Sequence, residues 1–173
     1  QIGAIGLGAI VGVFLVRAGA APGPAALPLT VSRAAGAFWL LLFFALLIGL
    51  PLLASRSSDP SLALLDAFYR AGSLVFGGGH VVLPLLQAEV VPPGWVTNDA
   101  FLAGYGAAQA VPGPLFTFAA YLGAVIGGWP AAALCLVAIF LPSFLLVAGT
   151  LPFWEAIRSK AAAQSALAGV NAA

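Results

Sequence analysis

The chain carries no charged residue between Ala100 and Trp154. A water-soluble fold cannot accommodate so long an uncharged stretch, because roughly 25% of the residues in such a fold are charged and most of them lie at its surface. The whole chain follows the same pattern, since 62% of its 173 residues are hydrophobic and only 6% are charged. We therefore expect an integral membrane protein.

The few charged side chains divide the chain into apolar segments that are candidate membrane spans. Residues 2–16 and 34–54 each suit one crossing, because a helix needs about 20 apolar residues to traverse the hydrocarbon. Residues 71–88 are long enough only if their glycines are tolerated, and residues 100–154 hold at least two passages. The fold class predicted is all-α, a polytopic transmembrane helix bundle with interrupted helices.

Three further boundaries follow from local sequence. GGWP at residues 127–130 divides the long uncharged block, because a proline disfavours helix at the residue before it and Trp favours the membrane interface. A last helix is expected to begin near Glu155. Residues 17–33 and 55–70 are expected to be loops on opposite sides of one span, and since each carries two arginines, the positive-inside rule does not orient the chain.

One interruption is predicted where three consecutive glycines precede the only histidine: Gly77, Gly78, Gly79 and His80. Each glycine costs a helix about 1 kcal/mol relative to alanine, and Pro84 removes a further backbone hydrogen bond. We expect the helix to break here. In lipid a break leaves polar backbone groups without partners, so it is tolerated where it lines a cavity.

A second interruption is predicted some thirty residues later, in AQAVPGPLFTF. Pro112 ends the preceding helix, while Gly113 and Pro114 resemble the cap and the first position of a new one. Paired spans interrupted by glycine and proline indicate a transporter's binding site near the bilayer midplane.

The two breaks also predict the charge of the ligand. Half-helices starting near His80 and Leu115 would direct free N–H groups and a partial positive charge into the breaks, which suits an anion. Gln109 and Thr117 could add donors. Few intramembrane acids are present to coordinate a metal ion, so we expect an anion as substrate and neither a metal nor a cofactor.

Packing is the competing explanation for small residues in membrane helices. Ala119, Gly123 and Gly127 at four-residue spacing read as a close helix contact, whereas consecutive glycines exceed what packing requires. A lone histidine such as His80 is often structural, and that alternative stays open. Cys135 is expected to pack as a small hydrophobic residue.

Two acidic positions outside the breaks have expected roles. Glu89 is a candidate proton carrier. Thr97, Asn98 or Asp99 is expected to cap the helix that follows.

Other function classes fit less well. An intramembrane hydrolase lacks a GxSxG or HExxH sequence, so we expect no enzyme, and no glycine-rich loop ends in Lys-Ser or Lys-Thr for ATP binding. No basic cluster suggests nucleic acid. A structural or channel-forming membrane subunit stays open, and would show close helix packing without breaks.

The segments FGGGHVVLPLLQAEVV and GWVTNDAFLAGYGAAQAVPGPLFTFAAYLGA resemble the signature region of the chromate ion transporter family. The resemblance runs from about Leu65 to Gly149 and points to the second of the two homologous halves in long-chain members. It implies a secondary transporter, coupled to an ion gradient, that exports chromate or sulfate-like oxyanions across the bacterial inner membrane.

The resemblance also implies a domain organisation. Residues 1–16 correspond to the last span of a preceding half, 17–33 to the connector, and 34–173 to a second half that continues further. The family's motifs fall on Gly77–His80 and Pro112–Pro114, with Gln109 just upstream. The expected partners are the oxyanion, the lipid bilayer and the other homologous half of the same chain, with a homodimer as a further possibility.

Overall fold

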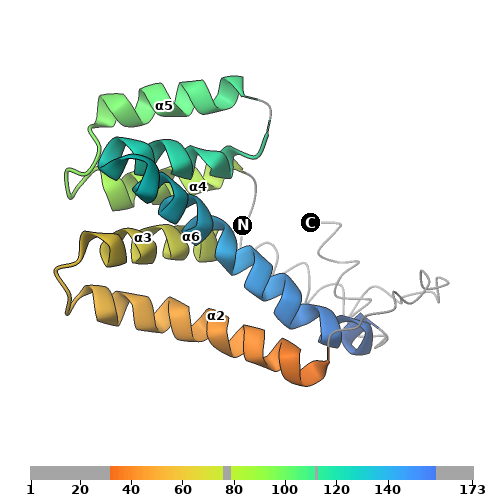
Figure 1. Ribbon diagram of the computed structural model, residues 1–173. Coiled ribbons are helices and arrows are strands. Elements are labelled where there is room, and N and C mark those ends of the chain that lie inside the picture. The colour runs from red at the N-terminus through yellow and green to blue at the C-terminus, as the bar shows by residue number, and fades with distance from the viewer. Residues whose placement is uncertain (1–31, 76–78, 112, 159–173) are drawn as a thin grey trace, which may run out of the picture. The chain divides into compact units, whose positions relative to one another are not determined.

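The described part of the chain is helical throughout. A computed structural model describes residues 32–75, 79–111 and 113–158 (Figure 1). The helices are α2 (Arg33–Ala54), α3 (Pro60–Leu74), α4 (Gly79–Val90), α5 (Asn98–Ala110), the 3₁₀ helix η1 (Leu115–Thr117) and α6 (Phe118–Arg158). Within these ranges there is no strand, which confirms the predicted all-α class. The predicted span at residues 2–16 lies outside the described residues.

The chain divides into two compact units, which we describe separately. One holds residues 39–147, and the other holds residues 1–38 and 148–173. In the second unit the start of α2 packs closely against the end of α6, because a Cβ atom added to Gly36 would lie 2.9 Å from the carbonyl oxygen of Gly149. Glycine at position 36 permits this approach.

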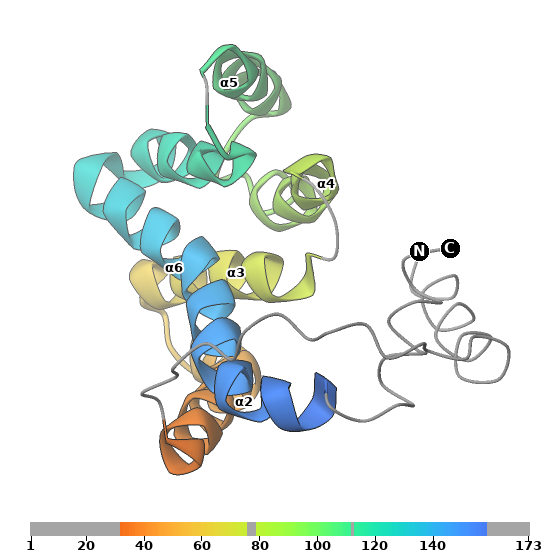
Figure 2. The same ribbon diagram turned by 90° about the vertical axis from the view of Figure 1, so that its right-hand side faces the viewer.

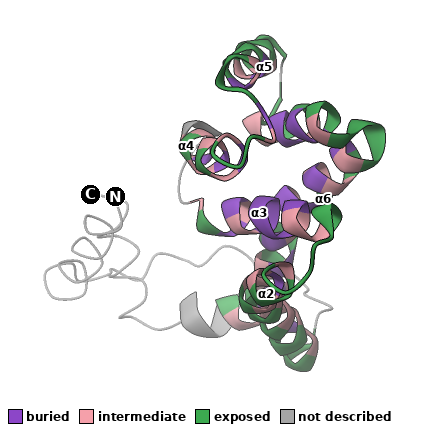
Figure 3. Ribbon diagram, turned by 90° about the vertical axis from the view of Figure 1, so that its left-hand side faces the viewer, coloured by how far each residue is buried: buried purple, intermediate pink, exposed green. Residues whose placement is uncertain are grey.

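Helix α2 is apolar after Arg33, its first residue. Its 22 residues extend for about 33 Å at 1.5 Å per residue, close to the thickness of the hydrocarbon core. By length and composition it is one of two described helices able to cross a membrane, the other being Leu115–Trp154. Much of its surface is exposed (Figure 3), as expected of a helix that faces lipid. The helix predicted at residues 34–54 is confirmed.

Helices α3 and α4 form an antiparallel pair, which we call hairpin 1 (Figures 1 and 2). Helix α3 starts where Pro60 follows its N-cap Asp59, whose carboxylate accepts a hydrogen bond of 2.9 Å from the backbone N–H of Ser61. Helix α4 contributes buried side chains at four-residue intervals to the core that it shares with α3: Val82, Leu86 and Val90. This spacing places them on one face of the helix.

A second antiparallel pair, which we call hairpin 2 (residues 98–126), has α5 as one arm and η1 with the start of α6 as the other. Thr97 caps α5 by accepting a bond of 3.2 Å from the N–H of Ala100, as predicted. The Tyr121 hydroxyl donates to the carbonyl oxygen of Ala100 at 3.1 Å, and the rings of Phe101 and Phe118 pack edge to face at 5.1 Å. These contacts join the first turn of α5 to the start of α6.

The chain turns sharply within α6, at the predicted GGWP divider. Gly127 and Gly128 leave helical geometry, with φ of −151° and 71°, and Trp129 is 88% exposed. A Cβ on Gly123 would overlap the carbonyl oxygen of Ala131, so the segments on either side of the turn touch. The predicted packing role of Gly123 is therefore confirmed. We call residues 129–147 the long arm.

The long arm passes closely over hairpin 1. A Cβ on Gly72 of α3 would overlap the carbonyl oxygen of Ile139 and lie 3.0 Å from its carbonyl carbon. Cys135 is fully buried in the same core, where it packs as a small hydrophobic residue, as expected.

In the unit 39–147 the helix connections gather at two ends (Figure 1). One end, which we call the polar end, holds the connections at residues 55–59, 91–97 and 127–128. At the other end, which we call the tip end, α3 and α5 finish and α4 and η1 begin. At or beside the connections of the polar end are Arg56, Asp59, Trp95, Asp99 and Trp129. The side-chain amide of Gln87 donates to Asn98 Oδ1 at 2.8 Å and links the two hairpins there.

Two predicted boundaries are wrong. The loop predicted over residues 55–70 ends at Pro60, because Asp66 and Arg70 lie one turn apart in α3 and their opposite charges pair at 3.4 Å. No new helix begins near Glu155, since α6 continues to Arg158 and a single glutamate does not interrupt a helix.

Candidate oxyanion site at two hairpin tips

The tip end brings together two helix starts that are far apart in sequence. Helix α4 begins at Gly79 and η1 begins at Leu115, close to the positions predicted for the two half-helices. Helix α4 packs against η1, and Figure 2 looks onto this end of the unit. The first N–H groups of a helix have no partner inside it, so both starts offer donors and partial positive charge.

The second tip has a backbone that only glycine adopts readily. Gly113 has a φ of 150°, and no described residue lies within 4 Å of the position its Cβ would occupy. Pro114 is the N-cap of η1 and not its first residue as predicted, and no side chain caps this start. The N–H groups at the start of η1 are therefore not covered by a capping side chain, and an anion can accept from them.

The two predicted polar donors of this tip are exposed. Gln109 lies near the end of α5 and Thr117 at the end of η1. The Thr117 hydroxyl donates to the carbonyl oxygen of Pro114 at 2.9 Å, so it would have to rotate to donate to a ligand. Both residues lie at the tip end, as the sequence predicts.

Part of the predicted site lies outside the described residues. Gly77, Gly78 and Pro112 are among these, and for His80 the structure describes only the backbone, in the first turn of α4. Their substrate-binding roles stay predictions.

Glu89 is not at the tips. It lies ten residues after Gly79, about 15 Å along α4, and its Oε2 accepts a hydrogen bond of 2.7 Å from Arg70 Nη2. Asp66 of α3 contacts the same nitrogen at 3.4 Å. This cluster of Asp66, Arg70 and Glu89 was not predicted from the sequence, although the four-residue spacing of Asp66 and Arg70 indicates a paired charge on a helix.

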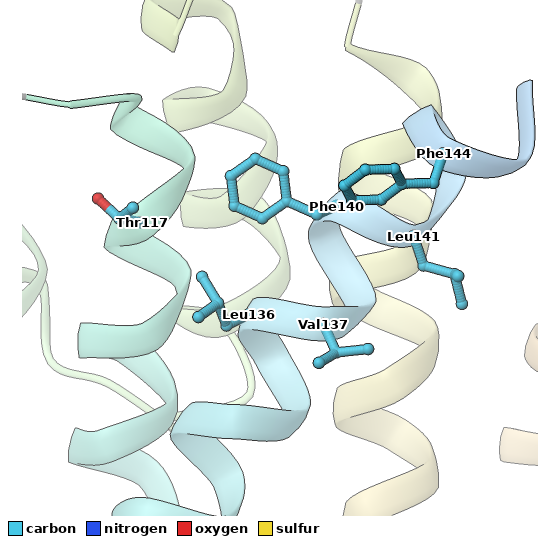
Figure 4. A pocket seen from close by; sticks show the side chains of 6 residues that line it. All are labelled: Thr117, Leu136, Val137, Phe140, Leu141 and Phe144. Atoms are coloured by element: carbon cyan, nitrogen blue, oxygen red, sulfur yellow. The ribbon is translucent and has the colours of Figure 1, made fainter. Parts of the chain in front are cut away.

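Two cavities border Thr117. A cavity of about 230 Å³ lies between the arms of hairpin 2 and is lined by Gly104, Ala107, Ala108, Val111, Thr117, Phe118 and Tyr121. A larger groove of about 440 Å³ lies between Thr117 and the apolar side chains of the long arm (Figure 4). The groove is almost wholly apolar, which suits lipid or another apolar surface better than a doubly charged anion.

Apolar helices, paired hairpins and the adjacent starts of α4 and η1 together describe an all-α membrane protein with a candidate anion site. The Chromate transporter family profile matches residues 62–173 of the chain. The chain belongs to this family of membrane-embedded transporters. The match begins within α3, so it includes both hairpins.

Several curated proteins are similar to the chain. It is 42% identical over 87 residues to an "Uncharacterized transporter YwrA" of Bacillus subtilis, a match covering 49% of each protein. It is 39% identical over 75 residues to a "Chromate transport protein" of Pseudomonas aeruginosa, covering 43% of this chain and 18% of the relative. A "Probable chromate transport protein" of Synechococcus elongatus is 31% identical over 115 residues, or 62% of this chain and 29% of the relative.

The chain thus spans less than two thirds of the length of these relatives. No solved structure matches it.

Proposed function

We propose that this chain forms part of a secondary transporter that exports chromate, or a sulfate-like oxyanion, across the bacterial inner membrane. The observation that carries this proposal is the meeting of two uncapped or glycine-preceded helix starts at one end of a membrane-embedded fold. Membership of the chromate transporter family and the names of two relatives point to the same class of ligand.

The short arms of the hairpins suggest where this end lies in the membrane. Helices α3, α4 and α5 have 15, 12 and 13 residues, which is about 18–22 Å of helix, against about 30 Å of hydrocarbon. Charged residues and tryptophans mark the polar end as the one at the membrane surface. Both hairpins would then enter from that surface and turn back inside the membrane, with their tips near its middle.

Backbone that turns inside a membrane needs partners for its polar groups. Chromate and sulfate are tetrahedral dianions whose oxygens accept several hydrogen bonds, so N–H groups from the starts of α4 and η1 can replace part of their water shell. In this proposal Gly77, Gly78 and Gly79 keep side chains away from the ligand at one tip, and Pro112, Gly113 and Pro114 do so at the other. His80, Gln109 and Thr117 supply side-chain donors.

The transporter is proposed to be larger than the described unit. Residues 34–173 would form one of two homologous halves, with residues 1–16 from the preceding half and 17–33 as the connector. The other half would cover the apolar groove beside Thr117, and a homodimer is the corresponding arrangement for a protein with a single half. The whole would be a multi-pass protein, and its energy source an ion gradient.

We favour transport over a purely structural or channel-forming role because of the break at Gly113. Close packing at Gly72 and Gly123 would serve any helix bundle, whereas Gly113 has open space where a side chain would lie. In this proposal that space lets a ligand approach the backbone at the start of η1.

Uptake into everted membrane vesicles tests the proposal. Vesicles containing the full-length protein should accumulate chromate when energised and lose it on addition of an uncoupler, and parallel assays with sulfate and molybdate identify the preferred oxyanion. Gly113→Leu should abolish uptake without loss of membrane insertion.

Gly94→Leu is the matched control, because Gly94 also has a positive φ, 77°, and open space around it but lies at the polar end. Wild-type vesicles that take up none of the three oxyanions would refute the proposed function. Equal uptake by the Gly113→Leu and wild-type proteins would refute the proposed site.

A further inference from the structure

The cluster of Asp66, Arg70 and Glu89 joins the two arms of hairpin 1. Arg70 Nη2 lies 2.7 Å from Glu89 Oε2 on α4 and 3.4 Å from Asp66 Oδ2 on its own helix. Two carboxylates therefore share one guanidinium, and the cluster holds one negative charge in excess when both acids are ionised. Intramembrane charges are costly and are kept where they serve ion or proton movement.

The two carboxylates are not equivalent. Glu89 makes the short, charge-assisted hydrogen bond to Arg70, and its side chain is 30% exposed. Asp66 is the most buried charged residue described, with 9% of its surface exposed, and its contact with Arg70 is longer than a hydrogen bond. The uncompensated negative charge therefore belongs to Asp66.

The guanidinium is also incompletely bound. Arg70 Nε is buried and has no hydrogen-bond partner among the described residues. A buried donor without an acceptor has a free-energy cost, so the pairing with Glu89 and Asp66 does not satisfy the guanidinium fully.

No other ionisable group described near the cluster supplies a positive charge that would neutralise Asp66. Residues 39–54 of α2 contain none, and residues 118–147 of α6 bring only Tyr121, which is bonded to Ala100, and the buried Cys135. On α3 the Tyr69 hydroxyl is bonded to the carbonyl oxygen of Phe43, and on α5 Asp99 and Tyr105 belong to hairpin 2. The His80 side chain of α4 lies outside the described residues.

We propose that Asp66 is the site where the transporter binds its coupling proton, an inference that rests on the proposed secondary transport. A proton adds to a carboxylate oxygen of Asp66 and forms an O–H bond, which leaves Arg70 paired with Glu89 in a neutral cluster. The proton leaves when Asp66 again contacts Arg70. A metal cation does not fit, because the guanidinium already occupies the space between the carboxylates, and no group of three metal-binding side chains occurs among the described residues.

The cluster can influence the tips because it bridges the arms that carry them. Asp66 lies eight residues before the end of α3, about 12 Å along the helix axis from the first tip. Asp66 is therefore a coupling residue that does not touch the oxyanion, and its loss should separate proton movement from oxyanion movement.

Liposomes containing the full-length protein, chromate and a trapped pH-sensitive dye test this. The wild-type protein should accumulate chromate in response to an imposed pH gradient and move protons as it does so. Asp66→Asn should reduce gradient-driven accumulation and chromate-dependent proton flux by at least about tenfold, the scale of a typical coupling between two sites. It should still let chromate equilibrate down its own gradient. Asp59→Asn, a change at an exposed N-cap where asparagine caps equally well, should behave as wild type.

Asp66→Glu keeps a titratable carboxyl group and is the second test variant, which can be used if Asp66→Asn does not fold. It should retain accumulation driven by the pH gradient with a displaced pH profile. The inference is overturned if either variant shows wild-type coupling and pH profile, if a folded Asp66→Asn protein moves no chromate in any direction, or if sodium replaces the proton. Failure of the wild-type protein to move any oxyanion would refute the proposed function itself.

Discussion

The contact between Gly123 and the backbone of Ala131 is the most sharply defined test of the fold. A Cβ atom at position 123 would overlap the Ala131 carbonyl oxygen and lie 2.7 Å from the Ala131 carbonyl carbon, where ordinary contacts begin at 3.4 Å. The two segments would have to separate by at least about 0.7 Å, the difference between these distances, because the carbonyl oxygen lies closer still. Overpacking of this kind costs about 1–3 kcal/mol, and because the neighbour is backbone we expect the upper part of that range.

Gly106 of α5 provides the control, since nothing lies within 4 Å of its Cβ position. Gly106→Ala should stabilise the helix by about 0.5–1 kcal/mol through propensity alone, and Gly123→Ala gains the same amount before the overlap is counted. The two variants should therefore differ by about 2–3 kcal/mol, or roughly 5–10 °C in the apparent melting temperature of the detergent-purified protein. Equal melting temperatures, or a more stable Gly123→Ala protein, would show that the chain does not reverse at Gly127 and Gly128.

Two further substitutions test individual hydrogen bonds. Tyr69→Phe removes the hydrogen bond of 3.0 Å from the buried hydroxyl to the Phe43 carbonyl while keeping the ring. Thermal unfolding should show a loss of about 0.6 kcal/mol in stability, as is usual for a hydrogen bond between membrane helices. No loss of stability would mean that α2 and α3 are not joined there. Thr117→Val removes a hydrogen-bond donor at the tip and should lower vesicle uptake of chromate by about tenfold. Thr117→Ser keeps the hydroxyl and should retain uptake. Equal uptake by both variants would show that Thr117 is not part of the site.

The helix ends were the most predictable part of the fold. Consecutive glycines at 77–79 and the prolines at 112 and 114 act on the backbone itself, so the sequence predicts the start of α4 at Gly79 and of η1 at Leu115 to within a residue. The GGWP turn and the cap at Thr97 follow from equally local rules.

The direction of the chain after each break was not predictable in the same way. A run of glycines shows that a helix stops, but the contacts that fold α4 back along α3 involve residues far apart in sequence, such as Arg70 and Glu89. The same limitation explains the error over residues 55–70. The sequence prediction takes a charged residue as the end of a span, whereas Asp66 and Arg70 lie inside α3 and contact each other at 3.4 Å.

In the candidate site, too, the features set by local backbone chemistry were predictable and the contacts between helices were not. The helix starts and Gly113 follow from backbone chemistry and lie where the sequence predicts, and Gln109 and Thr117 follow because they are adjacent to a break. Glu89 lies at the far end of its helix, and its partner Arg70 was not identified, because a salt bridge between two helices depends on their packing. Ion pairs between elements are the least accessible part of such a site to sequence reasoning.

The central claim is that the tip end binds an oxyanion, and cysteine labelling tests it most directly. In a Cys135→Ala background, Val111→Cys at the exposed C-cap of α5 in the full-length protein should react with a membrane-impermeant thiol reagent, and chromate or sulfate should slow the reaction by at least about tenfold, as expected when bound ligand blocks a site. Gly94→Cys at the polar end should react at a rate that the oxyanion does not change. A Val111→Cys protein that reacts equally with and without oxyanion, or not at all, would contradict the account.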